Sequence, residues 1–187
     1  MAERTAQVGV LISGRGSNMQ ALVQQADGYD VVLVASDKPE AVGLAWALEQ
    51  GIPTFALSPK EIGKPAYEAA LDAALRAAGV EVIALAGYMR LLSPNFVNRW
   101  RDRILNIHPS LLPAYKGLDT HARALAAGET FAGCSVHLVT EELDGGEVLG
   151  RMPVSILPGD TAETLAERVL VAEHSLYPRI LTEFVGR

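Results

Sequence analysis

Short apolar runs alternate with longer helix-periodic stretches through the first half of the chain, and this alternation limits the possible folds most strongly. The apolar runs are continuous, as in strands that are covered on both faces. They lie at Val8–Ser13, Val31–Ala35, Thr54–Leu57 and Val82–Ala86. Alanine-rich stretches with helical periodicity separate them, at Asn18–Gln25, Val42–Gln50 and Ala66–Ala78. Strands that alternate with helices predict an α/β fold around a largely parallel sheet.

The second half of the chain departs from this alternation. A short strand at Ile104–Ile107 is followed by His108–Pro113, where two prolines exclude regular structure and predict a loop. Further on, a turn-rich segment joins two apolar runs, which predicts an antiparallel hairpin. The expected elements are a helix at Thr120–Ala127, strands at Ser135–Val139 and Val148–Val154, and a connecting turn at Glu141–Gly146.

A long helix is expected at the C-terminal end. Asp160 and Glu163 have the spacing of a capping box, and helical periodicity continues to about Phe184, with Pro178 as a kink or break. The sequence has no internal repeat or linker, and one domain is the default for 187 residues. We therefore predict a single domain over residues 1–187. Its fold is expected to be Rossmann-like with three layers, a mostly parallel sheet, an antiparallel hairpin in the C-terminal half and a long C-terminal helix.

Charge and composition argue against several classes of partner. The chain has 16 Lys and Arg against 22 Asp and Glu, a net charge of −6, so its surface repels polyanions. No apolar run approaches the roughly 18 residues that a membrane span needs. The single cysteine, Cys134, cannot form an internal disulfide, which fits a reducing compartment. We therefore expect a cytoplasmic protein that binds small molecules, and neither nucleic acid nor membrane.

A glycine-containing segment, Ser13–Asn18, follows the first strand and opens the first helix. Free backbone N–H groups and the helix N-terminus face one point there, which predicts an anion site. A dinucleotide fingerprint would need glycine where Met19 stands, although Asp37 lies about where a ribose-binding acid is expected. A turn that merely connects strand to helix is the structural alternative. Ser17 and Asn18 favour phosphate, because both residues are good caps and donors.

Asn106 and His108 are two positions apart on an extended segment, so their side chains share one face while Ile107 points into the core. An amide donor beside an imidazole can stabilise an oxyanion and move a proton. A lone histidine is nevertheless more often structural. Asp144 precedes Gly145 in a common turn dipeptide, and its spacing alone favours a hairpin tip without a catalytic role.

The remaining reactive residues are weaker candidates. His121, His137 and His174 do not have the spacing of metal ligands, and the sequence has no Cys-x-x-Cys motif, so no metal site is expected. Cys134 has no evident activating partner, and a covalent nucleophile is not expected either.

Four segments in one order carry a resemblance to a known family. They are Gly14–Asn18, Leu85–Pro94, Leu105–Pro113 and Glu142–Gly146. Together they resemble the folate-dependent formyltransferases, within them the phosphoribosylglycinamide formyltransferases. The Asn-x-His-Pro-Ser-Leu-Leu-Pro block with a later Asp-x-Gly is highly specific to this chemistry, and the resemblance covers nearly the whole chain.

The resemblance implies transfer of a formyl group from 10-formyltetrahydrofolate to the amino group of 5-phosphoribosylglycinamide. This is a step of purine (IMP) biosynthesis, and it would proceed directly through a tetrahedral intermediate in a monomer or homodimer. The N-terminal half would bind the phosphate or nucleotide, and the C-terminal half would bind folate and catalyse. The implied residues are Asn106, His108 and Asp144 for catalysis; Gly16, Ser17, Asn18 and Glu173 for the ribonucleotide; and Lys64, Met89, Arg90, Leu91, Leu92 and Asn106 for folate.

Three other activities remain as alternatives. Methionyl-tRNA formyltransferase shares the catalytic block, but the net charge of −6 argues against a tRNA partner. Formyltetrahydrofolate hydrolase uses a similar core to release formate, usually behind an N-terminal regulatory domain, whereas the first strand here begins at about Val8. A non-enzymatic nucleotide-binding module would use the glycine loop and Asp37.

Overall fold

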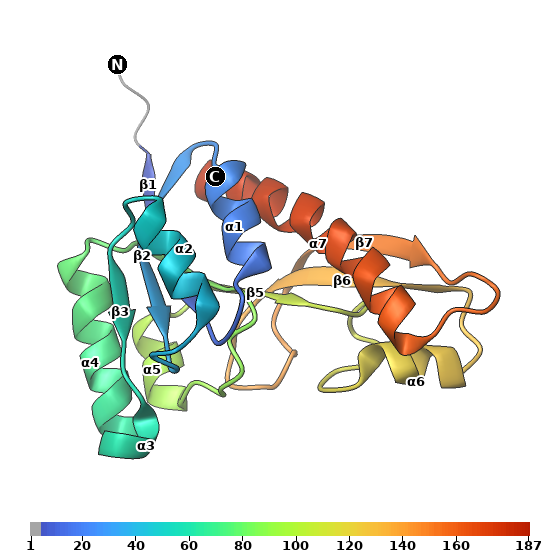
Figure 1. The fold of residues 1–187 in the computed structure, drawn as a ribbon, viewed down its shortest axis with the longest axis horizontal. Helices are drawn as coiled ribbons and strands as arrows, with labels where there is room; N and C mark the ends of the chain where they lie inside the picture. The colour runs from blue at the N-terminus through green and yellow to red at the C-terminus, as the bar shows by residue number, and fades with distance from the viewer. Residues whose placement is uncertain (1–4) are drawn as a thin grey trace.

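A single seven-stranded sheet organises the computed structural model, which describes residues 5–187 (Figure 1). The elements are β1 (Ala6–Ile12), α1 (Ser17–Gln24), β2 (Tyr29–Ser36), α2 (Val42–Glu49), β3 (Thr54–Ala56), α3 (Pro59–Ile62), α4 (Lys64–Ala77), β4 (Val82–Leu85), α5 (Pro94–Arg99), β5 (Ile104–His108), α6 (Thr120–Ala126), β6 (Phe131–Leu138), β7 (Val148–Ser155) and α7 (Ala162–Val185). The strand order is β3-β2-β1-β4-β5-β6-β7. The pairings from β3 to β5 are parallel, and β5–β6 and β6–β7 are antiparallel. The predicted fold class is confirmed.

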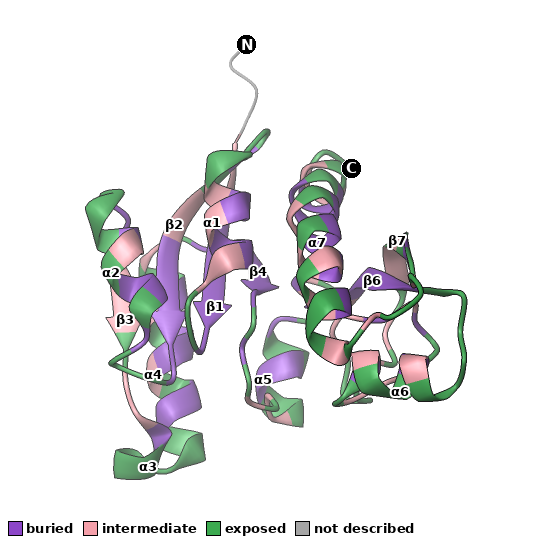
Figure 2. Cartoon of the chain, turned by 45° about the vertical axis from the view of Figure 1, so that its right-hand side comes forward, coloured by how far each residue is buried: buried purple, intermediate pink, exposed green. Residues whose placement is uncertain are grey.

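Helices cover both faces of the sheet, as Figure 2 shows for the buried central strands. On one face α1, α2 and α7 contribute Leu22, Leu44 and Leu176 to one buried apolar cluster. On the other face α4 and α5 contribute residues such as Leu71 and Phe96 to a second cluster. All four residues of β4 are buried, as expected for a strand between two helical layers.

The glycines after α2 and α4 end these helices as the sequence predicts. Gly51 has a φ of +74° and Gly79 a φ of +71°, in the left-handed region that glycine adopts without a steric cost. After α2, the N–H of Ile52 donates to the carbonyl of Ala47 at 3.0 Å, the long closing bond of a Schellman motif. At the end of α4, the N–H of Val80 donates to the carbonyl of Leu75 in the same way.

The predicted C-terminal hairpin is confirmed, but β6 begins at Phe131 and not at Ser135. The first part of this strand was not predicted, because it contains Gly133, and a glycine inside an apolar run suggests a turn. In the structure a Cβ at Gly133 would collide with the backbone carbonyl of Met152 on β7. Glycine is therefore part of the strand, at a point where two backbones approach closely.

Two short helices, α3 and α5, were not predicted from the sequence. Both begin with proline, at Pro59 and Pro94. Proline suits the first helical position because the N–H that it lacks has no intrahelical partner there. These helices are too short to show a clear hydrophobic period. The other predicted boundaries differ from the observed ones by a few residues at most.

The predicted capping box of Asp160 and Glu163 is wrong. The helix begins one residue later, so Thr161 is the N-cap and exchanges hydrogen bonds with Thr164. Asp160 instead forms an ion pair with Arg168, with 2.8 Å between Oδ1 and Nη2.

Pro178 does not break α7, which continues from Ala162 to Val185. Proline has no N–H for the carbonyl four residues earlier, that of His174. This carbonyl accepts a hydrogen bond of 3.0 Å from Nε2 of Gln25, which directly follows α1. The proline therefore leaves an acceptor that ties α7 to the first helix.

Asp72 of α4 organises a polar cluster against α5. It accepts a hydrogen bond of 2.7 Å from the indole N–H of Trp100 and bonds of 3.1 Å from Arg76. The guanidinium groups of Arg76 and Arg103 lie 5.1 and 4.7 Å from the centre of the Trp100 ring. Burial raises the pKa of Asp72, but the hydrogen bonds from Arg76 and Trp100 outweigh burial, and the net pKa is lowered.

Asp72→Asn should lower the free energy of unfolding by about 1–2 kcal/mol at pH 7, because the amide can still accept from Trp100 but loses its charge. The folded pKa of Asp72 lies below the unfolded value. The stabilisation is therefore present above the unfolded pKa of 3.8 and disappears as the pH falls through the folded pKa. Urea denaturation at several pH values measures this difference. Arg101→Ala, which removes an exposed hydrogen bond to Asn98, is the control and should cost less than about 0.5 kcal/mol.

Candidate active site

The strand order places a ligand-binding position beside β1 and β4. The chain proceeds from β1 outward to β2 and β3, and then crosses back to β4 on the other side of β1. In open α/β sheets, ligands bind outside the carboxyl ends of the strands at such a switch point. The strands β1, β4 and β5 all end at this edge, and most of the predicted site residues lie in these strands or directly after them.

The pairing of β5 with β6 brings two polar pairs together on one face of the sheet. Asn106 lies opposite His137, and His108 lies opposite Ser135. Ile107 belongs to the apolar cluster under α7, so it points into the core as predicted. His137 is a further residue of this site that was not predicted from the sequence. The available signal was its i, i+2 spacing from Ser135, which matches that of Asn106 and His108 on the partner strand.

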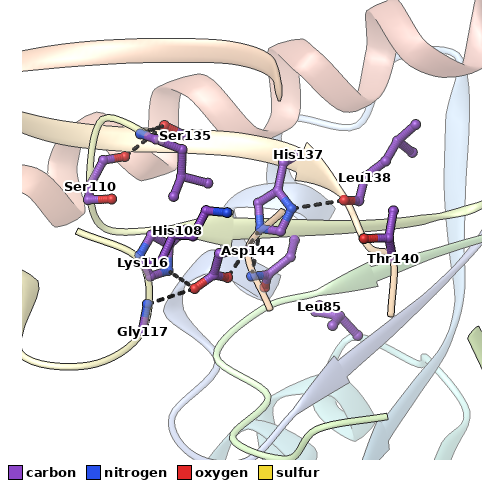
Figure 3. A network of polar contacts seen from close by, with 12 residues as sticks. Leu85, His108, Ser110, Lys116, Gly117, Ser135, His137, Leu138, Thr140 and Asp144 are labelled. Atoms are coloured by element: carbon purple, nitrogen blue, oxygen red, sulfur yellow. Dashed lines mark hydrogen bonds and ion pairs between the residues drawn. The ribbon is translucent and has the colours of Figure 1, made fainter. Parts of the chain in front are cut away.

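Both ring nitrogens of His108 face hydrogen-bond acceptors, one of which is the Asp144 carboxylate shown in Figure 3. Nε2–H donates to the backbone carbonyl of Tyr115 at 2.9 Å. Nδ1 lies 3.5 Å from Oδ2 of Asp144, and both side chains are more than nine-tenths buried. A neutral imidazole has only one N–H and can donate to only one of these two acceptors. Oδ2 of Asp144 also accepts the N–H of Gly117 at 2.9 Å.

His137 differs from His108 in the groups around its ring. Nδ1–H donates to the carbonyl of Leu138 at 2.9 Å, while Nε2 lies 3.3 Å from the amide nitrogen of Asn106 and 3.5 Å from Oδ1 of Asp144. Burial lowers the pKa of His137 and outweighs the raising effects of Leu138 and Asp144. With a neutral ring protonated at Nδ1, Nε2 accepts a hydrogen bond from Asn106 and orients its amide.

The loop after β6 folds back over the sheet and carries Asp144 inward. Asp144 has a φ of +48°, a left-handed conformation that Asp tolerates better than most residues. A Cβ at Gly146 would collide with the carbonyl of Leu138, so the loop can turn this tightly only with glycine. The Asp-Gly-Gly sequence therefore does more than form a hairpin tip, since it buries the carboxylate between two histidines.

Ser135 anchors the proline-containing loop after β5. Its hydroxyl donates to the carbonyl of Ser110 at 2.7 Å and accepts the N–H of Leu112 at 3.0 Å. The Leu112–Pro113 peptide bond is cis. The two hydrogen bonds of the Ser135 hydroxyl position the loop that leads to Tyr115 and Gly117. The backbone groups of these two residues contact His108 and Asp144.

The glycine loop lies at the start of α1 and faces α7. Gly16 is the N-cap, with a φ of +72°. The amide nitrogen of Asn18 donates to Oε2 of Glu173 at 2.8 Å, while the buried Oδ1 of Asn18 has no hydrogen-bond partner among the described residues. Burial raises the pKa of Glu173, and the bond from Asn18 partly offsets this shift. The structure thus brings the predicted residues Asn18 and Glu173 into direct contact, with Gly16 and Ser17 beside them in the chain.

The side chain of Asp37 points into the protein interior. Ser13 Oγ–H donates to Oδ1 at 2.6 Å, and Arg90 Nε–H donates to Oδ2 at 2.9 Å. Asp37 is only 4% exposed. Both oxygens are engaged within the protein, so the alternative of a dinucleotide site loses the acidic group on which it depended.

The predicted folate residues differ in exposure. The side chains of Met89 and Leu91 are exposed, whereas Arg90 and Leu92 are partly buried. Lys64 is the exposed first residue of α4, and its ammonium forms no ion pair with any residue that the structure describes.

The reactive groups outside this site have no evident chemical role. Burial, aided by Glu173, raises the pKa of Cys134 to about 12, so its thiol stays protonated. Residues 5–187 contain no group of three or more His, Cys, Asp or Glu side chains that could hold a metal ion. Within the same range, none of the helices is both long and apolar enough to cross a membrane.

The sheet with its switch point and the arrangement of Asn106, His108 and Asp144 agree with the result of family comparison. The chain belongs to the formyl transferase family, whose pattern matches residues 6–181. It is 42% identical over 180 residues to the phosphoribosylglycinamide formyltransferase of Escherichia coli K12, covering 94% of this chain and 85% of that protein. The crystal structure of phosphoribosylglycinamide formyltransferase from Brucella melitensis has a TM-score of 0.93 and 52% identity, and the match covers 98% of this chain and 97% of that one.

A longer protein also contains a segment similar to this chain. The trifunctional purine biosynthetic protein adenosine-3 of Drosophila melanogaster is 46% identical over 193 residues, which cover 100% of this chain and only 14% of that protein. This chain therefore corresponds to a small part of a multifunctional relative and to most of a separate bacterial one.

Asp144→Asn should lower the pKa of His137 further, because the negative charge of Asp144 is one of the groups that raise it. NMR titration of the His137 ring measures the change. Wild-type His137 should titrate below the ordinary value of 6.5. Asp119→Asn, at an exposed position before α6, is the matched control and should leave the titration unchanged. A shift of the His137 pKa in the opposite direction would contradict the proposed contacts.

Proposed function

We propose that this chain transfers a formyl group from 10-formyltetrahydrofolate to the amino group of 5-phosphoribosylglycinamide. The observation that carries the proposal is the set of contacts in which Asp144 meets His108 and His137, and His137 meets Asn106. Similarity to phosphoribosylglycinamide formyltransferases along most of the chain supports this choice of substrates. The proposed unit is the whole domain, as a monomer or homodimer in the cytoplasm.

The first chemical step is attack of the substrate amine on the formyl carbon. The resulting tetrahedral intermediate carries an oxyanion, which needs hydrogen-bond donors. Asn106 has a second amide N–H besides the one directed at His137. The Nε2–H of His108 is bonded to Tyr115, so the charged donor is its Nδ1–H, which lies 3.5 Å from Asp144 and can turn to the oxyanion. Donors held in place before the reaction stabilise the developing charge without reorganising.

Asp144 keeps His108 charged and holds a water molecule for proton transfer. Its carboxylate lies 3.5 Å from each of the two imidazoles, so it faces His108 as a counter-charge. The attacking nitrogen must lose a proton, and the departing folate nitrogen must gain one. A water that is hydrogen-bonded to both Asp144 and His108 at the side of their contact can carry this proton. The folate supplies the carbon, and the protein supplies orientation and charge.

The ribonucleotide binds at the start of α1. Its phosphate accepts hydrogen bonds from the backbone N–H groups of Gly16, Ser17 and Asn18, where the helix dipole also favours an anion. Glu173 and the free Oδ1 of Asn18 offer acceptors to the ribose hydroxyls. Burial of these acceptors favours a ligand that satisfies them.

The folate binds along the segment after β4. Its pterin ring contacts mainly backbone groups of Met89, Arg90, Leu91 and Leu92, and Asn106 faces the formyl group. The exposed side chains of Met89 and Leu91 offer apolar surface to the rest of the folate. Lys64 is a further candidate contact for an anionic group of the folate, as a point charge rather than the planar fork of an arginine.

A spectrophotometric assay with 5-phosphoribosylglycinamide and a 10-formyl folate analogue tests the proposed reaction. Deformylation of the folate should require the amine and yield the formylated ribonucleotide. Release of formate without the amine would instead identify a hydrolase. Binding of NAD by calorimetry, with no formyl transfer, would indicate the non-enzymatic alternative.

Asp144→Asn should lower kcat by about two or more powers of ten, the scale expected for acid-base groups, while both substrates still bind. The amide keeps the shape of the carboxylate but cannot act as counter-charge to His108. Steady-state kinetics and equilibrium binding separate the two effects. Asp119→Asn again serves as the control. Near-normal turnover in Asp144→Asn would leave Asp144 as a residue of the turn only.

Gly16→Val should raise KM for the ribonucleotide by about tenfold or more and affect KM for the folate far less. Gly16 has a left-handed φ, and an added Cβ would lie 2.8 Å from Cε of Met19. Valine therefore distorts the backbone that binds the phosphate. Gly14→Val is the matched control, since a Cβ at Gly14 meets no atom within 4 Å. Equal increases in both KM values for Gly16→Val would contradict separate binding sites.

A further inference from the structure

A polar cluster at the ligand-binding edge of the sheet centres on a buried carboxylate, Asp37, which the mechanism described above does not use. It consists of Ser13, Asp37 and Arg90, joined by the two hydrogen bonds to Asp37. Ser13 follows β1, Asp37 follows β2, and Arg90 belongs to the segment after β4. The cluster therefore connects the ends of three adjacent strands at the edge of the sheet where ligands bind.

Ser13 extends the cluster to the backbone of the segment after β4. Its hydroxyl donates its hydrogen to Asp37, and its oxygen accepts a hydrogen bond of 2.9 Å from the N–H of Met89. Asp37 thus holds two successive residues, Met89 through Ser13 and Arg90 through its guanidinium. The Arg90 side chain is 36% exposed and the Asp37 side chain 3%, so the carboxylate is the buried partner.

Other side chains hold the two flanks of residues 87–93, which we call the folate loop. The hydroxyls of Tyr67 and Tyr88 lie 3.0 Å apart, and burial raises the pKa of Tyr67 to about 12, so that hydroxyl stays protonated. At the other end, the carboxylate of Glu68 accepts the N–H and the hydroxyl of Ser93. Asp37 is the acidic group that holds the middle of the loop.

The glycine loop depends on a different kind of contact. The N–H of Ser13 donates to the carbonyl of Gly87 at 3.2 Å, and the carbonyl of Gly14 accepts the N–H of Gly43 at 3.0 Å. These are backbone bonds, which a change at Asp37 leaves in place. Ser13 belongs to both networks, because its N–H bonds to Gly87 and its hydroxyl bonds to Asp37 and Met89. The residues that face the phosphate, 16–18, are held apart from Asp37 by the bond from Asn18 to Glu173.

We propose that Asp37 is a positioning residue for the formyl donor. Through Ser13 and Arg90 it sets the place of the Met89 and Arg90 backbone, and so determines how tightly the folate binds and where its formyl carbon lies. This inference rests on the proposed function, because it assigns the folate to this loop. It makes the carboxylate at the end of β2 a determinant of donor binding, although Asp37 itself touches neither substrate.

Asp37→Asn tests this role in the full-length chain. The amide has one acceptor in place of two charged ones, so the bonds from Ser13 and Arg90 cannot both persist at full strength. KM for the 10-formyl folate analogue, and its Kd by calorimetry, should rise by about tenfold, the size expected for losing one charge-assisted bond. KM for 5-phosphoribosylglycinamide should change by less than about twofold, because its loop keeps its backbone bonds.

Asp72→Asn is the matched control for a merely structural effect. Asp72 is also a buried aspartate that bonds to an arginine, but its cluster lies between α4 and α5 and includes no residue of the folate loop. It should lower stability and leave both KM values unchanged. If the two variants lose similar stability and only Asp37→Asn changes donor affinity, the positioning role is supported.

A double-mutant cycle with Arg90→Gln adds a second test. If Asp37 acts partly through Arg90, the loss of donor affinity in the double variant should be smaller than the sum of the losses in the two single variants. Unchanged donor KM and Kd in Asp37→Asn would overturn the inference and leave the proposed function intact. A wild-type chain that neither binds the folate nor transfers its formyl group would overturn both.

Discussion

The antiparallel pairing of β5 with β6 is the interaction on which the candidate site depends. It places Asn106 against His137 and His108 against Ser135, and it starts the loop that returns Asp144 over the sheet. Each of these side chains contacts a group from another segment. A slip of β6 by one residue in this pairing would turn Ser135 and His137 to the opposite face, where the apolar cluster under α7 lies.

The energetic cost of burying polar groups at this site is offset by hydrogen bonds and opposite charges from specific partners. An unpaired carboxylate or imidazolium is costly away from water, and the cost falls when opposite charges and hydrogen bonds meet. Asp144 meets His108 and the N–H of Gly117, and Asp37 meets Ser13 and Arg90. The site is thus organised before substrate binds, which favours catalysis because less reorganisation accompanies the reaction.

Much of the fold follows from local patterns. Continuous apolar runs predict the central strands because both faces of the sheet are covered, and glycines predict the ends of α2 and α4 because only glycine readily adopts the required φ. Local patterns fail where tertiary contacts decide. Gly133 lies inside a strand because β7 approaches it, and α3 and α5 are too short to show a period.

The sequence by itself determined that Asn106 and His108 share a face, since alternation along a strand is a local property. It also determined that a glycine turn opens α1, because only residues adjacent in the chain are involved. Only the tertiary structure decided that Asp144 meets His108, that His137 orients Asn106 and that Asp37 holds the folate loop. These contacts join residues far apart in the chain, and they depend on strand order and register, which the period of one segment does not specify.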